Sequence, residues 1–192
     1  GWAWSDVLLL YRRMEDHALG AGPYHGAGGP LHVTDISGDE HPLTRVYLQA
    51  GQEAGLPLSR DLNGASIEGV GLYQINTSGG FRMSAARAYL WPARKRPNLR
   101  VEVDALATQI LFDGNRAVGI QYEQHGRKHE VRAGKEVILA GGAINTPQLL
   151  QLSGIGDETL LRACGIAVRR HLPAVGQNLQ DHLCHDYVYR AK

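Results

Sequence analysis

A continuously apolar run that leads into paired glycines constrains the fold of this chain most. The segment "KEVILAGG" ends at Gly142 and has the composition of a short strand buried on both faces of a parallel sheet. Thr146 and Pro147 follow, and they predict a helix start with threonine as the N-cap and proline at the first helical position. A strand that ends in Gly141-Gly142 and leads into a helix places backbone amides at a carboxyl-end crevice of the sheet, where nucleotide cofactors bind in open α/β folds.

Three strand-like runs precede this segment. They read "LRVEVDALATQILF", "RAVGIQYEQ" and "KHEVRA", and they are separated by tight-turn sequences at Asp113-Gly114-Asn115 and His125-Gly126. Together they predict an antiparallel meander. A meander next to a strand of the parallel-sheet type indicates a mixed α/β (α+β) fold class.

The N-terminal half predicts three helices, the last of them at "RMSAARAYL", and a stretch of loops. Ser5 can cap a first helix, and a second runs from Pro42 to a C-cap at Gly55. Residues 61–80 are rich in Gly, Asn and Ser and predict loops and short strands. The glycine-rich loop at 20–30 precedes a strand-like segment rather than a helix, so we interpret it as a flexible linker or surface loop and not as a phosphate cradle.

The composition disfavours several classes of protein. Among 192 residues, 43% are hydrophobic, which is enough to bury a core, and 20 basic against 19 acidic side chains favour no nucleic acid, anionic membrane or acidic substrate. No apolar run approaches the ~20 residues that span a bilayer. Two cysteines are too few for a disulfide framework, which favours a reducing compartment such as the cytoplasm. Because the chain begins at Gly1 rather than methionine, we expect a fragment.

Cysteine and histidine residues near the C-terminus are candidates for zinc binding or catalysis. Structural zinc sites show paired ligands at short fixed spacings, and only one dense group occurs here, so metal binding is disfavoured and Cys164 is expected to be a buried apolar residue. A Cys-His catalytic pair has no residue to orient the histidine. Asp181 and His182 are adjacent on an extended segment and point to opposite faces, which favours a structural role. The cysteines and histidines concerned are Cys164, His171, His182, Cys184 and His185.

The segment "GGAINTPQLLQLSGIG" resembles the second signature of the glucose-methanol-choline (GMC) oxidoreductases, flavoenzymes that oxidise alcohols. Thr146-Pro147 and the run from Ser153 to Gly156 fall at the spacing of that signature. The segments "GWAWSDVL", "DLNG" and "GIAVRRHLPAVGQNLQDH" are similar to segments that occur in the same order in bacterial choline and alcohol dehydrogenases. The resemblance covers nearly the whole chain.

The resemblance implies FAD as the cofactor and an alcohol as the substrate of the full-length relative. It places the backbone of Ala107 at the adenine edge of FAD, and Ala140, Gly141 and Gly142 at a strand end that passes close to the cofactor, where missing side chains permit close approach. It implies no catalytic residue here, because the family's glycine-rich fingerprint and catalytic histidine match no segment of this chain. The absence of G-x-G-x-x-G between a strand and a helix also disfavours nicotinamide binding.

The resemblance also suggests how the chain is divided. Residues 1–38 correspond to a helix and loop of the FAD-binding domain, 39–90 to a partial substrate-domain insertion, 91–182 to the FAD-binding portion with the meander and signature, and 183–192 to the start of a substrate-domain segment. We therefore expect a partial FAD-dependent oxidoreductase acting on CH-OH donors that contributes to the FAD site and is inactive alone. The alternative is a non-catalytic module that associates with itself or with a complementary chain through exposed interfaces.

Overall fold

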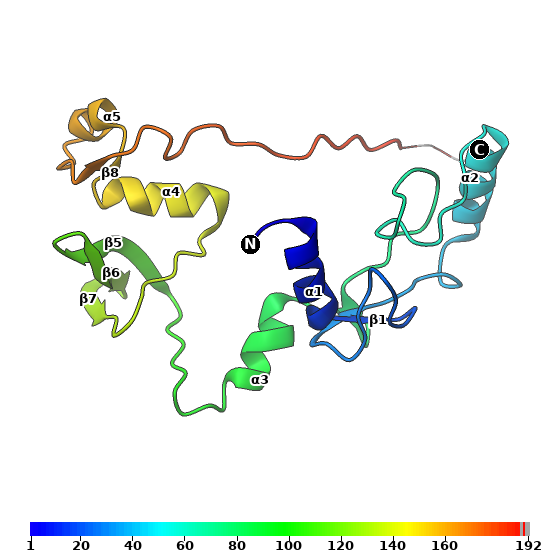
Figure 1. Ribbon diagram of the computed structural model, residues 1–192, viewed down its shortest axis with the longest axis horizontal. Coiled ribbons are helices and arrows are strands. Elements are labelled where there is room, and N and C mark those ends of the chain that lie inside the picture. Colours follow the sequence, from blue (N-terminus) through cyan, green and yellow to red (C-terminus); the bar gives the residue numbers. More distant parts are fainter. Residues whose placement is uncertain (189, 191–192) are drawn as a thin grey trace. The chain divides into compact units, whose positions relative to one another are not determined.

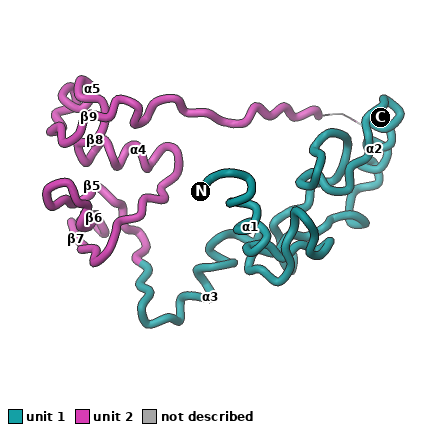
Figure 2. The backbone as a smooth tube through the Cα atoms, in the orientation of Figure 1, with its two compact units in different colours: residues 1–101 teal, residues 102–192 magenta. Residues whose placement is uncertain are grey.

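The computed structural model describes residues 1–188 and 190, and the chain forms two compact units (Figures 1 and 2). Unit 1 comprises Gly1–Val101 and unit 2 comprises Glu102–Lys192. Both units combine helices with small sheets, which confirms the mixed α/β fold class. No helix among the described residues is long and apolar enough to cross a membrane.

Unit 1 contains short helices and two-stranded sheets joined by long loops. Its helices are α1 (Trp4–Met14), α2 (Pro42–Glu53), the π-helix η1 (Ala86–Leu90) and α3 (Trp91–Ala93). Its strands are β1 (Glu15–His17), β2 (Leu31–Val33), β3 (Thr77–Ser78) and β4 (Phe81–Arg82). The loops and short strands predicted for residues 61–80 are therefore confirmed.

The predicted helices of unit 1 form, the third as η1, and the first needs one correction at its cap. Ser5 lies inside α1 instead of capping it, because the chain enters the helix at Ala3, whose backbone N–H donates to the Asp6 carboxylate at 3.1 Å. The prediction for α2 is confirmed. Pro42 is its first residue, the His41 ring accepts a hydrogen bond from the second, and Gly55 follows its end with φ +92°.

The glycine-rich loop at 20–30 connects two parallel strands. Strand β1 pairs in parallel with β2, which confirms the strand predicted after the loop. The loop packs against the end of α1 so closely that a side chain on Gly26 would overlap the carbonyl oxygen of Arg12. Glycine is therefore required here for close packing of one backbone on another, and the loop is a packed surface loop.

Unit 2 begins with the predicted meander. Strands β5 (Ala105–Asp113), β6 (Arg116–Gln124) and β7 (Arg127–Arg132) form an antiparallel sheet in the order β5-β6-β7. The left-handed turn residues are Gly114, His125 and Gly126, as the two predicted tight turns require. The prediction of the meander is therefore confirmed, although its first strand begins at Ala105 rather than near Leu99.

The strand predicted for "KEVILAGG" is wrong. Residues 136–140 are extended but pair with no strand in the described part of the chain, and the Ile138 side chain is 76% exposed. An apolar run becomes a buried strand only where neighbouring strands complete its backbone hydrogen bonds. The segment therefore keeps the extended backbone of a strand without the ladder.

Helix α4 (Gly142–Leu152) also begins earlier than predicted. Its N-cap is Gly141 rather than Thr146, and Pro147 lies inside the helix instead of at its first position. Gly142 has φ +82°, a backbone conformation that only glycine adopts without strain, so the paired glycines turn the chain into the helix. Gly154 follows α4 with φ +83°, as expected of a helix stop.

The remainder of unit 2 is a small αβ element. Strand β8 (Ile155–Gly156) pairs in parallel with β9 (Arg170–His171), and α5 (Glu158–Ala163) lies between them in sequence, capped by the Asp157 carboxylate on the Leu160 amide at 2.9 Å. Cys164, predicted to be buried, is exposed, because it is the C-cap residue where the chain leaves α5. Leu161 is the buried residue of that helix.

Gly119 allows the strands β6 and β7 to pair, and it gives a first test of the fold. A side chain there would overlap the Val131 carbonyl oxygen, so Gly119→Val is expected to destabilise unit 2 by about 1–3 kcal/mol through overpacking. Hydrogen exchange of the β6 and β7 amides measures this as faster exchange. Gly134→Ala is the control, because a Cβ on Gly134 meets open space. Equal exchange in both variants would contradict the described pairing.

Candidate functional site

A cavity in unit 2 brings together residues that the sequence predicted to share a cofactor site. Its volume is about 320 Å³, and it lies among strands β5 and β6, the extended segment before α4, and α4 itself. Ala107, Ala140 and Gly141 line it, while Gly142 does not and instead begins α4. The other lining residues are Leu106, Ile120, Ile138, Leu139, Asn145, Thr146, Gln148, Leu149 and Leu152.

One buried serine holds α4 against the meander. The hydroxyl of Ser153 accepts a hydrogen bond from the Ile110 backbone N–H at 2.9 Å and donates one to the Leu149 carbonyl oxygen at 2.6 Å. Ser153 is only 6% exposed, and Ile110, at 5%, belongs to the small apolar core. Because the first bond joins β5 to the end of α4, it fixes how far the helix stands from the strand, and so sets the width of the cavity.

The glycines beside the cavity have separate roles. A side chain on Gly141 would lie 3.2 Å from the Asn145 Cβ and 3.3 Å from the Thr146 hydroxyl oxygen, so the first turn of α4 leaves little room there. A side chain on Gly142 would meet open space, and its positive φ is what demands glycine. Close packing thus favours glycine at position 141, and the backbone conformation requires it at position 142.

The electrostatic character of the cavity limits what it can bind. None of the residues that line it is charged, and its polar groups are the amides of Asn145 and Gln148, the hydroxyl of Thr146 and the exposed backbone. Such a lining can solvate an uncharged planar group through a few hydrogen bonds and apolar contacts. It contains no cation to balance a phosphate, so a charged part of a ligand must lie elsewhere.

The other candidate residues near the C-terminus do not converge. Asp181 accepts a hydrogen bond from the backbone N–H of His182 at 2.8 Å, so the contact does not involve the imidazole. The five cysteine and histidine residues considered as zinc ligands form no group within metal-binding reach in the described part of the chain. The acid-base and zinc interpretations therefore gain no geometric support.

Sequence reasoning missed a polar cluster in unit 1. His25 lies between the carboxylates of Glu15 and Asp61, at 2.9 Å from each. The partners are separated from His25 by 10 and 36 residues, so no local motif contains all three. One feature of the sequence could have indicated this cluster: a histidine stands within the glycine-rich loop. The glycines of the loop permit close packing, and this packing buries the histidine.

Comparison with known proteins assigns the chain to a family. Residues 1–184 match the family described as GMC oxidoreductase. The chain is 50% identical over 183 residues to the mitochondrial choline dehydrogenase of Homo sapiens, covering 95% of this chain and 31% of that protein. It is 44% identical over 183 residues to the oxygen-dependent choline dehydrogenase of Chromohalobacter salexigens, covering 95% and 33%.

A solved structure agrees with this assignment. An FAD-dependent oxidoreductase from Chaetomium thermophilum superimposes with a TM-score of 0.86 at 33% identity, covering 94% of this chain and 34% of that one. The chain thus belongs to the GMC oxidoreductase family, whose members are FAD-dependent flavoproteins. It spans about a third of the length of the curated relatives that it matches.

Ser153→Ala tests whether the hydroxyl holds α4 on the sheet. The variant leaves the buried Ile110 N–H without a partner, which is expected to lower the free energy of unfolding of unit 2 by about 1–3 kcal/mol. Urea unfolding followed by circular dichroism measures the change. Thr159→Ala removes an exposed hydroxyl on α5 and serves as the control, expected to stay within about 0.5 kcal/mol of the parent. An unchanged free energy of unfolding in Ser153→Ala would contradict the anchoring role of the hydroxyl.

Proposed function

We propose that this chain forms part of the FAD site of a choline dehydrogenase-like enzyme that oxidises alcohols, with the cavity of unit 2 as the adenine side of that site. The observation that carries the proposal is the meeting of Ala107 with Ala140 and Gly141 at one cavity. These residues come from two segments more than 30 positions apart, and the resemblance to the family independently assigns them to FAD. Family membership supports the choice of cofactor.

The register of the sheet supports a backbone contact at Ala107. Strand β5 is an edge strand, so one row of its backbone groups has no partner within the sheet. Ile110 turns its N–H outward to Ser153, and bonded and non-bonded pairs alternate along an antiparallel ladder. The irregularity between Ala107 and Gln109 inserts one extra residue, so Ala107 is expected to face outward as Ile110 does. Its backbone would then be free to contact the adenine edge.

The size and charge of the cavity fit one end of the cofactor. A volume of about 320 Å³ lies at the lower end of the ~300–1,000 Å³ range of small-molecule sites, which suits a nucleoside rather than a whole dinucleotide. The uncharged lining suits a purine base, which is planar and neutral. The pyrophosphate of FAD needs positive charge or free amides from another part of the protein.

The chain's own contribution is to bind and orient the cofactor. When bound, FAD supplies the acceptor for the electrons removed from the alcohol. Ala107 would hold the adenine edge through its backbone, and Ala140 and Gly141 would bring the extended segment close to it because neither has a bulky side chain. We assign no catalytic residue to this chain and expect no alcohol oxidation by it alone.

We also propose a cytoplasmic location, because the two cysteines are free and exposed, as is usual in a reducing compartment.

Retention of flavin by the purified chain tests the proposal. The chain is incubated with FAD and the dissociation constant is measured from flavin fluorescence, with FMN, which lacks the adenine, as the comparison ligand. FAD is expected to bind and FMN to bind at least about tenfold more weakly, a difference of about 1.4 kcal/mol. Ala107→Phe should fill the cavity and weaken FAD binding at least about tenfold.

Ala107→Val is the matched control for the flavin experiment. A backbone contact tolerates a small apolar side chain, so this variant is expected to bind FAD within about twofold of the parent. Equal binding of FAD and FMN, or equal loss of affinity in both Ala107 variants, would contradict an adenine contact made by the backbone at this position.

A second candidate function is association through the apolar rim of the same cavity. Of the apolar residues that line the cavity, Ile138 is 76% exposed, Leu106 69% and Leu152 47%, and monomeric proteins seldom expose several large apolar side chains together. This supports a non-catalytic role in which the surface binds a second copy or a complementary chain.

Light scattering distinguishes this candidate. If the rim drives association, the chain is expected to be larger than 20.9 kDa in solution, and Ile138→Ser should shift it toward the monomer mass. Leu183→Ser, at a fully exposed position outside the rim, is the control and should leave the mass unchanged. A parent chain that is monomeric at all concentrations would rule out self-association.

A further inference from the structure

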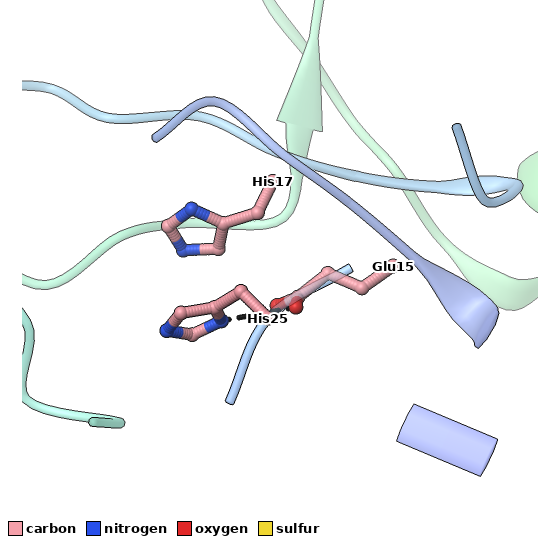
Figure 3. Close-up of side chains that lie close together, drawn as sticks. All are labelled: Glu15, His17 and His25. Atoms are coloured by element: carbon pink, nitrogen blue, oxygen red, sulfur yellow. Dashed lines mark hydrogen bonds and ion pairs between the residues drawn. The ribbon is translucent and has the colours of Figure 1, made fainter. Parts of the chain in front are cut away.

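A histidine in unit 1 bridges two carboxylates from distant parts of the chain. The ring of His25, on the loop between β1 and β2, lies 2.9 Å from Glu15 through Nδ1 and 2.9 Å from Asp61 through Nε2 (Figure 3 shows the Glu15 bond). The His25 side chain is 12% exposed, Glu15 19% and Asp61 28%, so the bridge is shielded from solvent. We call these three residues the His25 clamp.

The hydrogen bonds assign the charge of the clamp. Both ring nitrogens of His25 face carboxylate oxygens, and ionised carboxylates only accept hydrogen bonds, so both nitrogens must carry protons. His25 is therefore an imidazolium ion. The Gly26 N–H also donates to the bonded Glu15 oxygen at 3.0 Å, so this oxygen accepts from both the loop backbone and the His25 ring.

A second histidine is stacked on the first and must be neutral. The rings of His17 and His25 have their centroids 4.0 Å apart, with planes 31° from parallel (Figure 3). His17 is 4% exposed, and its Nδ1 accepts a hydrogen bond from the Leu19 N–H at 3.1 Å, so its single proton is on Nε2. A second positive ring at this distance would be repelled by the first.

The same hydrogen bonds argue against a metal at this cluster. Glu15, His17 and His25 each offer an atom within 4.8 Å of the others, which is close enough to consider a metal ion. A histidine binds a metal through an unprotonated nitrogen. His25 has no such nitrogen, and the one on His17 is occupied by the backbone. A proton on His25, rather than a metal ion, accounts for the arrangement.

We propose that the His25 clamp is a pH-sensitive link in unit 1: protonated His25 ties β1 to the loop around Asp61, and loss of its proton at alkaline pH releases that loop. The clamp joins a residue of segment 1–38 to one of segment 39–90, the two segments that the resemblance assigns to different domains. Neutral His17, whose ring lies against that of His25, limits the stability of unit 1 at acid pH, where His17 would gain a proton.

The surroundings determine the direction of each titration. Burial lowers the pKa of His25, but the hydrogen bonds and charges of Asp61 and Glu15 outweigh burial and leave its pKa above the usual value near 6.5. Burial lowers the pKa of His17, the charge of His25 lowers it further, and Glu15, Asp61 and Asp35 oppose this in part. Arg12 of α1 also approaches the cluster, donating to the His25 carbonyl oxygen at 3.4 Å.

These directions predict a stability profile with two limbs. Because the pKa of His25 is higher in the folded than in the unfolded chain, its stabilisation is complete below pH 6.5 and is lost as the pH rises through the folded pKa. Because the pKa of His17 is lower in the folded chain, stability also falls as the pH drops below 6.5. Unit 1 is therefore expected to be most stable near pH 6.5.

Thermal unfolding of the whole chain, followed by tryptophan fluorescence from pH 5.5 to 9.5, tests the proposal. All three tryptophans, Trp2, Trp4 and Trp91, lie in unit 1, so their emission reports on that unit. Loss of the His25 proton should lower the melting temperature as the pH rises through the alkaline limb. The drop is about 5 °C for every tenfold difference in proton affinity of His25 between the folded and the unfolded chain. His25→Gln should remove the alkaline limb and leave the acid limb smaller or shifted.

His32→Gln is the matched control. His32 also bonds a carboxylate, Asp16, at 2.8 Å, but it has one such partner and its side chain is 35% exposed. This variant should keep the alkaline limb of the parent. An alkaline limb that persists in His25→Gln, or that disappears equally in both variants, would overturn the proposal.

A spectroscopic titration keeps the proposal testable if His25→Gln does not fold. In ¹⁵N-labelled parent chain, the ring nitrogens of His25 should stay protonated above pH 6.5, while His17 stays neutral with its proton on Nε2. Asp61→Asn, which keeps the shape of the side chain, should lower the midpoint of His25. A His25 midpoint at or below 6.5, or a rise in melting temperature on addition of Zn²⁺ alone, would contradict the proton-held clamp.

Discussion

The hydrogen bond from the Ile110 backbone to the Ser153 hydroxyl is the constraint on which the cofactor-side geometry depends. It joins residues 43 positions apart and is buried. The meander by itself is a three-stranded sheet with an open edge, and α4 by itself is an 11-residue helix with no buried residue. Only when Ser153 ties the end of α4 to that edge does the extended segment before the helix come to lie beside Ala107 and form the cavity.

The local parts of this arrangement were predictable from the sequence, since they depend on residues near one another. The turns of the meander follow from Asp113-Gly114-Asn115 and His125-Gly126, and Gly114, His125 and Gly126 have positive φ in the structure. Helix α2 follows from Pro42 at its start and Gly55 beyond its end. The expectation that Ala107, Ala140 and Gly141 share a cofactor site rests on the resemblance to a family. Neither periodicity nor spacing indicates that these residues lie together.

The parts that failed depend on partners that local sequence does not specify. "KEVILAGG" has the composition of a buried strand, but no described strand pairs with it, so it remains extended and exposed at Ile138. Thr146-Pro147 is a strong start signal and predicts the start of α4 there, yet Gly142 at positive φ turns the chain four residues earlier. The His25 clamp needs Asp61, 36 residues away, and only tertiary packing brings it there.

The His25 clamp of unit 1 and the cavity of unit 2 differ in charge. In unit 1, two histidines bond to carboxylates: His25 to Glu15 and Asp61, and His32 to Asp16. In unit 2, the cavity is lined by uncharged residues alone. Charged hydrogen bonds thus hold the loop around Asp61 in unit 1, while the cavity of unit 2 is a neutral surface, as the proposed adenine site requires.

The most direct measurement of the central claim is a map of backbone amide shifts in ¹⁵N-labelled chain titrated with adenosine monophosphate. The account predicts shifts concentrated at Ala107, Ala140 and Gly141, with the amides of β7 and of unit 1 unaffected. Shifts located elsewhere, or none at concentrations that saturate FAD binding, would contradict the assignment of this cavity to the adenine side of the FAD site.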